Sequence, residues 1–214
     1  MSDELVFYTH PMSRGRIVRW MLEELGQPYT TEILDFATSM KAPAYLAINP
    51  MGKVPAIRHG DTVVTEAGAI CAYLADAFPQ AGLAPPPGDR RRGTYFRWMF
   101  FAAGPLELMT TLSSLAVDPG PERKVMVGYG SREDAFNAME TALSAGDWLL
   151  GDTFSAADVY FGSHIGWGLQ LGSIEKRPAF ERYNERLMNR PAALRAREID
   201  DRLIAATQAQ TEPA

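Results

Sequence analysis

Apolar positions in the first part of the chain follow two different periods. Leu5–Tyr8 is a short apolar run that predicts a strand, and apolar residues from Ile17 to Leu25 recur at helical spacing up to Gly26. Thr30–Leu34 predicts a second strand. Strand, helix and strand within about thirty residues imply a parallel pair joined by a right-handed crossover.

A hairpin and a helix are predicted next. The runs Ala56–Arg58 and Thr62–Thr65 flank the turn signal Gly60-Asp61 and predict an antiparallel pair. A helical pattern then runs over Gly68–Phe78 and stops at Pro79. The predicted order of elements is βαβ followed by ββα.

Only helical signals follow this region. Residues 80–93 contain Pro85-Pro86-Pro87-Gly88 and predict a linker. Beyond it the helical signals are the apolar spacing of Tyr95–Ala102 and Phe136–Leu143, a cap at Ser155, and prolines suited to a first helical turn at Pro178 and Pro191. We therefore expect an α/β domain over residues 1–79, a linker over 80–93 and an all-helical domain over 94–214.

Composition and charge narrow the class of protein. Hydrophobic residues make up 46% and charged residues 22% of the chain, which is ordinary for a soluble globular protein. The net charge of −5 and the spread of Lys and Arg argue against nucleic-acid binding, and the run Arg90–Arg92 is expected to be a solvated helix start. An Arg19–Glu23 pair is expected on the surface of the first helix. No apolar stretch reaches the ~18–20 residues that span a bilayer, and the N-terminus lacks a signal-peptide core, so we expect a cytoplasmic protein with no membrane partner.

Cysteine and histidine usage excludes several chemistries. Cys71 is the single cysteine, which excludes a disulfide framework, a C-x-x-C redox pair and a cysteine zinc site; we expect it in the core. The three histidines have no metal-ligand spacing, so no metal site is expected. His10 alone lies near a segment with candidate chemistry.

The segment Asn49–Ala56, of sequence NPMGKVPA, is the most informative part of the chain. A proline at a strand start cannot donate to a sheet, which suits an edge that faces a ligand. A cis bond before Pro55 would turn the amide and carbonyl of Val54 outward; only about 5–6% of such bonds are cis, so Pro55 by itself favours an ordinary trans proline. Glu66-Ala67-Gly68 opens a helix, whose first backbone N–H groups bind carboxylates. Together these features indicate a site that holds a small peptide by its backbone.

These residues closely resemble those of a known family. Asn49–Pro55 and Thr65–Asp76 are similar to the glutathione-binding half of cytosolic glutathione transferases, in particular a bacterial-type, serine-dependent class, and the resemblance extends over nearly the whole chain. In Leu150–Asp158, Ser155 and Asp158 have capping-box spacing and look like the start of the buried helix of that family's C-terminal domain. The resemblance implies a thioredoxin-like α/β N-terminal domain followed by an all-α helical-bundle C-terminal domain.

The turn Thr9–Arg16 carries the candidate catalytic residue. Ser13 sits where the first helix begins. A helix N-terminus with hydrogen-bond donors lowers a thiol pKa from roughly 8.5 to about 7 or below. The resemblance implies that Ser13 donates to the sulfur of glutathione, the co-substrate; a plain helix N-cap is the alternative. Tyr8 is a rival donor, although its place in the strand pattern favours core packing.

The resemblance also implies the residues that bind the rest of glutathione. Lys41 and Lys53 would pair with its glycine carboxylate. Val54, held by Pro55, would hydrogen-bond the cysteinyl backbone.

The γ-glutamyl end has its own expected partners. Glu66 would bind the ammonium group and the amide of Ala67 the carboxylate. Ala67 stands where serine is commonest in the family, and losing a hydrogen bond to a charged group costs on the order of 1.5–3 kcal/mol. We therefore expect modest affinity for glutathione, with Arg14 or Arg16 as compensating charges.

A second substrate is expected on apolar surface of the helical domain. Gly104-Pro105 should kink a helix near it. Helical spacing makes several of the candidates core residues, and the predicted pocket comprises Met12, Trp98, Phe101, Leu106 and Trp167. This surface implies a small hydrophobic electrophile.

The resulting hypothesis is a glutathione S-transferase that joins the glutathione thiolate to a hydrophobic electrophile. A glutathione-dependent isomerase or peroxidase would use the same site. A non-catalytic binding or regulatory module is a further alternative, favoured by Ala67 and opposed by Val54, Pro55 and Glu66. The resemblance also implies a homodimer.

Overall fold

The computed structural model describes residues 4–211. Its contacts group the chain into two compact units. The first comprises the residues up to 81 together with those from 189 onward, and the second comprises residues 82–188. The last helix falls in the same unit as the sheet, and the predicted domain boundaries stay a prediction.

The first unit is built on a four-stranded mixed sheet of order β2-β1-β3-β4. The strands are β1 (Leu5–Thr9), β2 (Thr30–Ile33), β3 (Ala56–His59) and β4 (Thr62–Thr65). The pair β1–β2 is parallel, and β3 is antiparallel to both β1 and β4. This agrees with the predicted crossover and hairpin, and it is the sheet of a thioredoxin-like fold.

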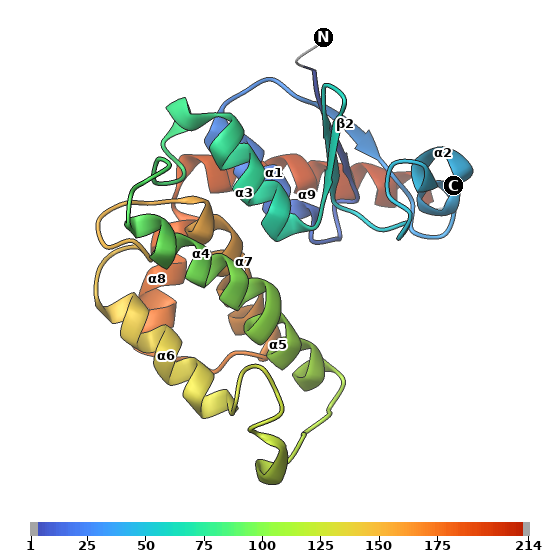
Figure 1. Cartoon of the computed structure of the whole chain (residues 1–214). Helices are drawn as coiled ribbons and strands as arrows, with labels where there is room; N and C mark the ends of the chain where they lie inside the picture. The colour runs from blue at the N-terminus through green and yellow to red at the C-terminus, as the bar shows by residue number, and fades with distance from the viewer. Residues whose placement is uncertain (1–3, 212–214) are drawn as a thin grey trace. The chain divides into compact units, whose positions relative to one another are not determined.

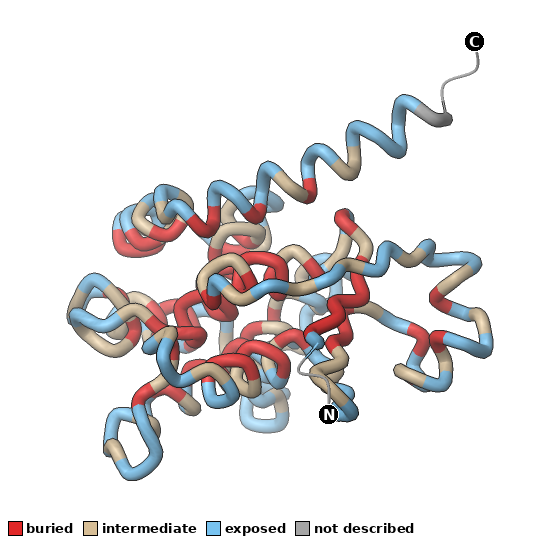
Figure 2. Tube along the Cα trace, turned by 90° about the horizontal axis from the view of Figure 1, so that it is seen from above, coloured by how far each residue is buried: buried red, intermediate tan, exposed pale blue. Residues whose placement is uncertain are grey.

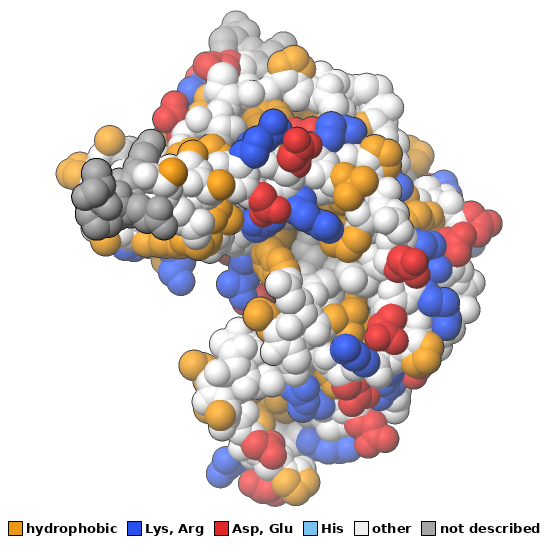
Figure 3. Space-filling model, turned by 180° about the vertical axis from the view of Figure 1, so that it is seen from behind, with side chains coloured by type: hydrophobic (Ala, Val, Ile, Leu, Met, Phe, Trp, Pro, Cys, Tyr) orange, Lys and Arg blue, Asp and Glu red, His pale blue; other side chains and the backbone are white. Residues whose placement is uncertain are grey.

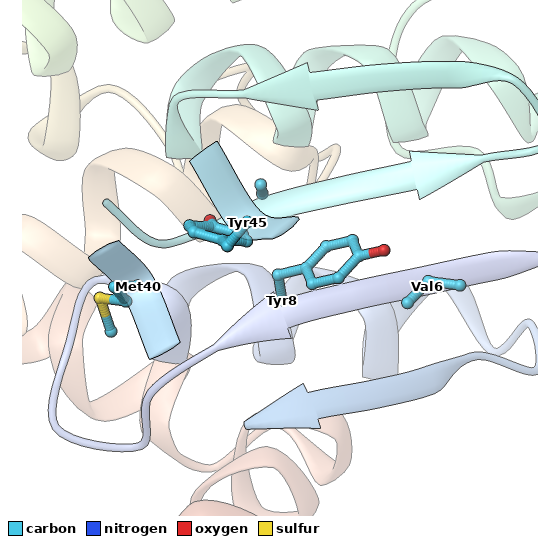
Figure 4. Packing of buried hydrophobic residues seen from close by; sticks show 5 residues of the cluster. Val6, Tyr8, Met40 and Tyr45 are labelled. Carbon is cyan, nitrogen blue, oxygen red and sulfur yellow. The ribbon is translucent and has the colours of Figure 1, made fainter. Parts of the chain in front are cut away.

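Successive side chains of β1 point to opposite faces of the sheet. Phe7 faces helix α1 (Gly15–Leu25), and its ring lies 5.0 Å from the guanidinium of Arg19. Val6 and Tyr8 face the other side, in a buried cluster that also contains Met40 and Tyr45 (Figure 4). These last two residues come from the 3₁₀ turn η1 (Ser39–Lys41) and the short helix α2 (Pro43–Leu46).

Two helices cover the Phe7 side of the sheet, and a third packs against the first of them. Helix α1 ends at Gly26, whose left-handed φ of 68° lets its N–H bond the carbonyl of Leu22 at 3.0 Å. Helix α3 (Ala67–Ala77) packs against α1 and β3. Helix α9 (Pro191–Thr211) runs along α1, as Figure 1 shows.

Helix α9 is buried only over its first half. Ala192, Ala193, Ala196 and Asp200 are buried, whereas residues 201–209 are exposed or half-buried (Figure 2). Arg19 on α1 is also buried, with 2% exposure. The expected surface pair of Arg19 and Glu23 is therefore wrong, because Arg19 bonds Asp200 instead.

The second unit contains only helices. The 3₁₀ turn η2 (Pro79–Ala81) precedes it. Its elements are α4 (Arg91–Phe101), a π-helical turn η3 (Ala102–Leu106), α5 (Glu107–Ser114), the 3₁₀ turn η4 (Pro121–Arg123), α6 (Arg132–Ser144), α7 (Ala156–Leu171) and α8 (Pro178–Met188). The π-helical turn contains Pro105, so the regular α-helix is interrupted there, while the predicted kink stays a prediction.

Helix α7 is the buried helix of this unit, and its N-terminus carries the predicted capping box. Asp158 Oδ2 accepts the N–H of Ser155 at 2.9 Å and its hydroxyl at 3.0 Å. Asp158 Oδ1 accepts the N–H of Leu149 at 2.8 Å and the hydroxyl of Tyr183 at 2.9 Å. Burial raises the pKa of Asp158, and these hydrogen bonds act against that shift.

The surface carries both signs of charge. On the face in Figure 3, basic and acidic side chains are interspersed. Among residues 4–211, no helix combines the length and the apolar character needed to cross a membrane.

Candidate functional site

The strand register brings three predicted site segments to one end of the sheet. Tyr8 lies opposite Ala56, and Ala56 lies opposite Thr65. The chain leaves β1 toward Ser13, enters β3 from Pro55 and leaves β4 toward Glu66 at this end. Because neighbouring strands lie about 4.8 Å apart, the three segments emerge within roughly 10 Å of one another. We call this end of the first unit the candidate site.

Ser13 stands in the turn between β1 and α1 and is half-buried. Its hydroxyl donates to the carbonyl oxygen of His10 at 2.7 Å. Its Oγ accepts the N–H of Gly15, the first residue of α1, at 2.9 Å. Ser13 thus caps a backbone N–H of α1 and keeps its oxygen at the positive end of the helix.

Gly15 is required by close packing of this turn. A Cβ at Gly15 would lie 1.9 Å from Thr9 Oγ1 and 3.0 Å from Ser13 Oγ. Thr9 is 1% exposed and cannot move easily. The absence of a side chain at Gly15 therefore lets β1 and α1 approach closely enough to hold Ser13.

His10 braces the same turn from the other side. Its Nδ1 accepts the N–H of Met12 at 3.1 Å, and its ring stacks on Phe36 at 4.2 Å between centroids. Phe36 is 50% exposed. The imidazole has a structural role here that the sequence did not indicate.

The peptide bond between Val54 and Pro55 is cis. Two side chains fix the loop that precedes it: Tyr45 Oη and Asn49 Nδ2 each donate to the carbonyl of Lys53 at 2.7 Å. Burial raises the pKa of Tyr45 to about 12, so its hydroxyl stays protonated as a donor at neutral pH. The backbone of Val54 is therefore presented from a well-braced loop.

The two lysines predicted to bind glutathione differ in their surroundings. Lys41 Nζ donates to the carbonyl of Gly52 at 2.7 Å and approaches that of Met51 at 3.4 Å. Gly52 has a φ of 56°, and a Cβ there would lie 2.9 Å from Lys41 Nζ. Lys41 is thus a brace of this loop, while Lys53 is exposed.

The third segment opens helix α3. Glu66 has a φ of 67°, which is rare for a residue other than glycine, and its side chain is exposed. Such a backbone persists where the surroundings hold it, often at ligand sites. Ala67 is the first residue of α3 and is 8% exposed.

Tyr8 lies in the core rather than in the turn. Its ring packs 5.7 Å from that of Tyr45 (Figure 4), and its hydroxyl hydrogen-bonds Arg58. Tyr8 is therefore engaged on the sheet.

The residues predicted for the second substrate fall in both units. Met12 belongs to the first unit and is 65% exposed. In the second unit, Trp98 and Leu106 are core residues, while Phe101 and Trp167 are half-buried. Trp98 packs edge-on against Phe101 at 5.2 Å, so these aromatic residues support one another.

A metal ion in the described part of the chain would need a cluster of side chains that could bind it. Within residues 4–211, no group of three or more His, Cys, Asp or Glu side chains is placed to hold a metal ion.

Comparisons with known proteins agree with the fold and the motifs. Residues 12–77 match the family model "Glutathione S-transferase, N-terminal domain", and residues 105–191 match "Glutathione S-transferase, C-terminal domain". A glutathione S-transferase-like protein of Aspergillus terreus is 34% identical over 169 residues, covering 72% of this chain and 73% of that protein.

Two solved structures extend this similarity to three dimensions. A glutathione transferase from Methylococcus capsulatus is 30% identical, with a TM-score of 0.76 over 92% of this chain and 98% of that one. A glutathione transferase from Phanerochaete chrysosporium, solved in complex with oxidized glutathione, is 25% identical, with a TM-score of 0.77 over 94% of this chain and 98% of that one.

Proposed function

Because the chain belongs to the glutathione S-transferase family, we propose that it is a transferase in which Ser13 activates the thiol of glutathione for attack on a hydrophobic electrophile. The observation that carries this proposal is the register at the end of the sheet, where the Ser13 turn, the cis Val54–Pro55 bond and the opening of α3 emerge together. The serine-dependent mechanism and the identity of the site residues are part of the proposal.

Glutathione fits the groups that this end of the sheet offers. An extended peptide can pair its cysteinyl backbone with Val54. The γ-glutamyl carboxylate meets the amide of Ala67 at the positive end of α3, and Glu66 takes its ammonium group. Lys53, which is exposed, suits the glycine carboxylate, and Lys41 reaches it only by leaving the carbonyl of Gly52.

Ser13 would act by changing one hydrogen bond. Its hydroxyl now donates to His10 O, and rotation about the Cβ–Oγ bond would direct the hydrogen to the glutathione sulfur instead, while Oγ keeps the N–H of Gly15. A hydrogen bond to the thiolate and the positive end of α1 both favour the ionised form. The thiol proton passes to solvent, the sulfur forms a bond to an electrophilic carbon, and the leaving group departs with its electron pair.

The proposal also covers the second substrate, the oligomeric state and the cellular role of the protein. Within the second unit, the half-buried Phe101 and Trp167 offer apolar surface for a small hydrophobic electrophile. We further propose that the protein is a cytoplasmic homodimer with a role in detoxification. Glutathione-dependent isomerisation or peroxide reduction would start from the same thiolate, so product analysis must separate these reactions.

The direct test is the ionisation of bound glutathione. The ultraviolet absorbance of the thiolate is followed as pH is varied, with glutathione alone as the reference. We expect the pKa of the bound thiol to fall from roughly 8.5 to about 7 or below. Glutathione that binds without this shift would favour the binding module, and failure to bind at all would refute both readings.

A further inference from the structure

Four ion pairs, spaced along the length of α1, connect this helix to the C-terminal segment that contains α9. Among the residues that form these pairs, the basic residues of α1 come before its acidic residues. The same order holds on the other side, from Arg190 just before α9 to Asp201 within it, so the two antiparallel segments match charge for charge. The pairs are Arg16–Asp201 at 2.7 Å, Arg19–Asp200 at 3.2 Å, Glu23–Arg195 at 3.1 Å and Glu24–Arg190 at 2.6 Å. A shift of α9 by one turn would break this match.

The second of these pairs fixes α9 against the core. Arg19 and Asp200 are each 2% exposed. The same guanidinium donates to Thr31 Oγ1 at 2.9 Å and lies over the rings of Phe7 and Tyr29. Removing one partner of a buried pair leaves an uncompensated charge, so this contact holds α9 in one register.

The neighbouring pair reaches the turn that carries Ser13. Asp201 follows the anchored Asp200 and accepts Arg16 Nη2 at 2.7 Å. Arg16 Nη1 in turn approaches the carbonyl of Pro11 at 3.5 Å. Arg16 therefore connects α9 to the β1–α1 turn two residues before Ser13.

We propose that Asp201 is a positioning residue: through Arg16 it holds the Ser13 turn in the shape that accepts glutathione. The proposal rests on the proposed function for its ligand. The proposal gives a role to Asp201, which lies outside the segments that the family models match, since the second match ends at residue 191. It also gives Arg16 a role other than direct charge compensation for Ala67.

The experiment compares two pairs of similar exposure on the same pair of helices. Asp201→Asn removes the charge from the pair next to Ser13, and the matched control Arg195→Gln removes the charge from the pair at the far end of α1. The two substituted side chains are similarly exposed, Asp201 at 56% and Arg195 at 53%. Asp201→Glu keeps the charge and serves as the rescue variant. Reduced glutathione binding is measured by calorimetry, and hydrogen exchange of the Thr9–Arg16 segment is measured without ligand.

We expect Asp201→Asn to raise the dissociation constant of glutathione about two- to five-fold, the range for an exposed ion pair. The same variant should speed exchange in the turn and raise KM more than it lowers kcat, while Arg195→Gln changes neither and Asp201→Glu recovers part of the loss. The difference from wild type should shrink in high salt.

The other outcomes each decide the matter. Tighter binding by Asp201→Asn would show that the aspartate acts only as a negative charge near an anionic ligand, which overturns the proposal. Equal effects of Asp201→Asn and Arg195→Gln would show a general loss of helix packing, which overturns the proposal. Faster exchange of the turn with unchanged glutathione affinity would show that the shape of the turn does not control binding, which also overturns it. If wild type does not bind glutathione, the proposed function fails, and the exchange comparison still decides whether Asp201 holds the turn.

Discussion

Ser13 Oγ lies 2.7 Å from the carbonyl oxygen of His10 and donates its hydrogen there. The second contact of Ser13 Oγ is the N–H of Gly15, which it accepts. In this arrangement the hydroxyl is a cap of the turn, so the capping role and the proposed catalytic role use the same atom. To activate a ligand thiol, the hydroxyl of Ser13 must stop donating to His10 O and donate to the sulfur instead.

Ser13→Ala tests that exchange. We expect the pKa of the glutathione thiol bound to the variant to return toward its value in free glutathione, and kcat to fall by about 10²-fold, as when one stabilising donor is lost. Tyr8→Phe is the control, because it removes the rival hydroxyl and keeps the packed ring. A normal thiol pKa shift in Ser13→Ala together with its loss in Tyr8→Phe would reverse the two roles.

Gly15→Ala tests the packing that places Ser13. The new Cβ would meet Thr9 Oγ1 at 1.9 Å, and overpacking of this kind costs about 1–3 kcal/mol of the free energy of unfolding. The double variant Thr9→Ala/Gly15→Ala removes the obstructing oxygen and should recover part of the loss, as measured by chemical denaturation. Gly104→Ala, with no atom within 4 Å of its Cβ, is the control. If the double variant is no more stable than Gly15→Ala, the collision with Thr9 is not the cause.

Local patterns were sufficient for the four strands and for most of the longer helices, while the site residues stay a prediction. The spacing from Ile17 to Leu25 with Gly26 predicted α1 to its last residue, and Pro178 and Pro191 each open a helix as expected. The motif around Pro55 indicated a ligand-facing edge because its chemistry is local. The cis bond there is confirmed, although the proline by itself favoured trans.

Long-range contacts are what the sequence did not reveal. Arg19 and Glu23 have the spacing of a surface pair, and only the arrival of Asp200 from 181 positions away makes Arg19 a buried residue. The partner of Tyr45 is much nearer in the chain, eight positions away, and it too depends on the folded loop: the hydroxyl of Tyr45 donates to the carbonyl of Lys53. No periodicity within either segment specifies such a partner.

Asp158 and Asp134 provide a matched pair of capping aspartates, one buried and one exposed. Asp158 serves Ser155 at the start of α7, and Asp134 serves Ser131 at the start of α6, where it accepts the hydroxyl at 2.6 Å. Asp158→Ala leaves the N–H of Leu149 and the hydroxyl of Tyr183 without their buried acceptor, so we expect the free energy of unfolding to fall by about 2–4 kcal/mol.

The matching variant is Asp134→Ala. It should lower the free energy of unfolding much less than Asp158→Ala does, because water replaces the lost acceptor. Thermal or denaturant unfolding of both variants measures the difference. Equal losses would show that burial of the aspartate is not the source of its contribution, and that the cap alone accounts for it.

Cys71 makes stability depend on pH in the alkaline range. Burial raises the pKa of its thiol well above the ordinary value. Because the folded state has the higher pKa, it binds the proton more tightly, and ionisation favours the unfolded chain. Stability from this group is therefore fully present below about pH 8.5, the pKa of an unfolded thiol, and is lost as pH rises toward the folded value. The loss approaches about 1.4 kcal/mol for each pH unit above that point.

Denaturant unfolding of wild type and Cys71→Ala at about pH 8 to 9.5 isolates this effect, since unfolded tyrosines titrate near pH 10. We expect the stability of wild type to decline across that range and the decline to be smaller in the variant, even though the lost sulfur lowers the stability of the variant at every pH. A thiol reagent should modify native Cys71 slowly at pH 8 and label one thiol per chain after denaturation, in line with the single cysteine. Rapid labelling of the native protein, with parallel pH profiles for the two proteins, would show that the thiol is reachable and that burial does not govern its ionisation.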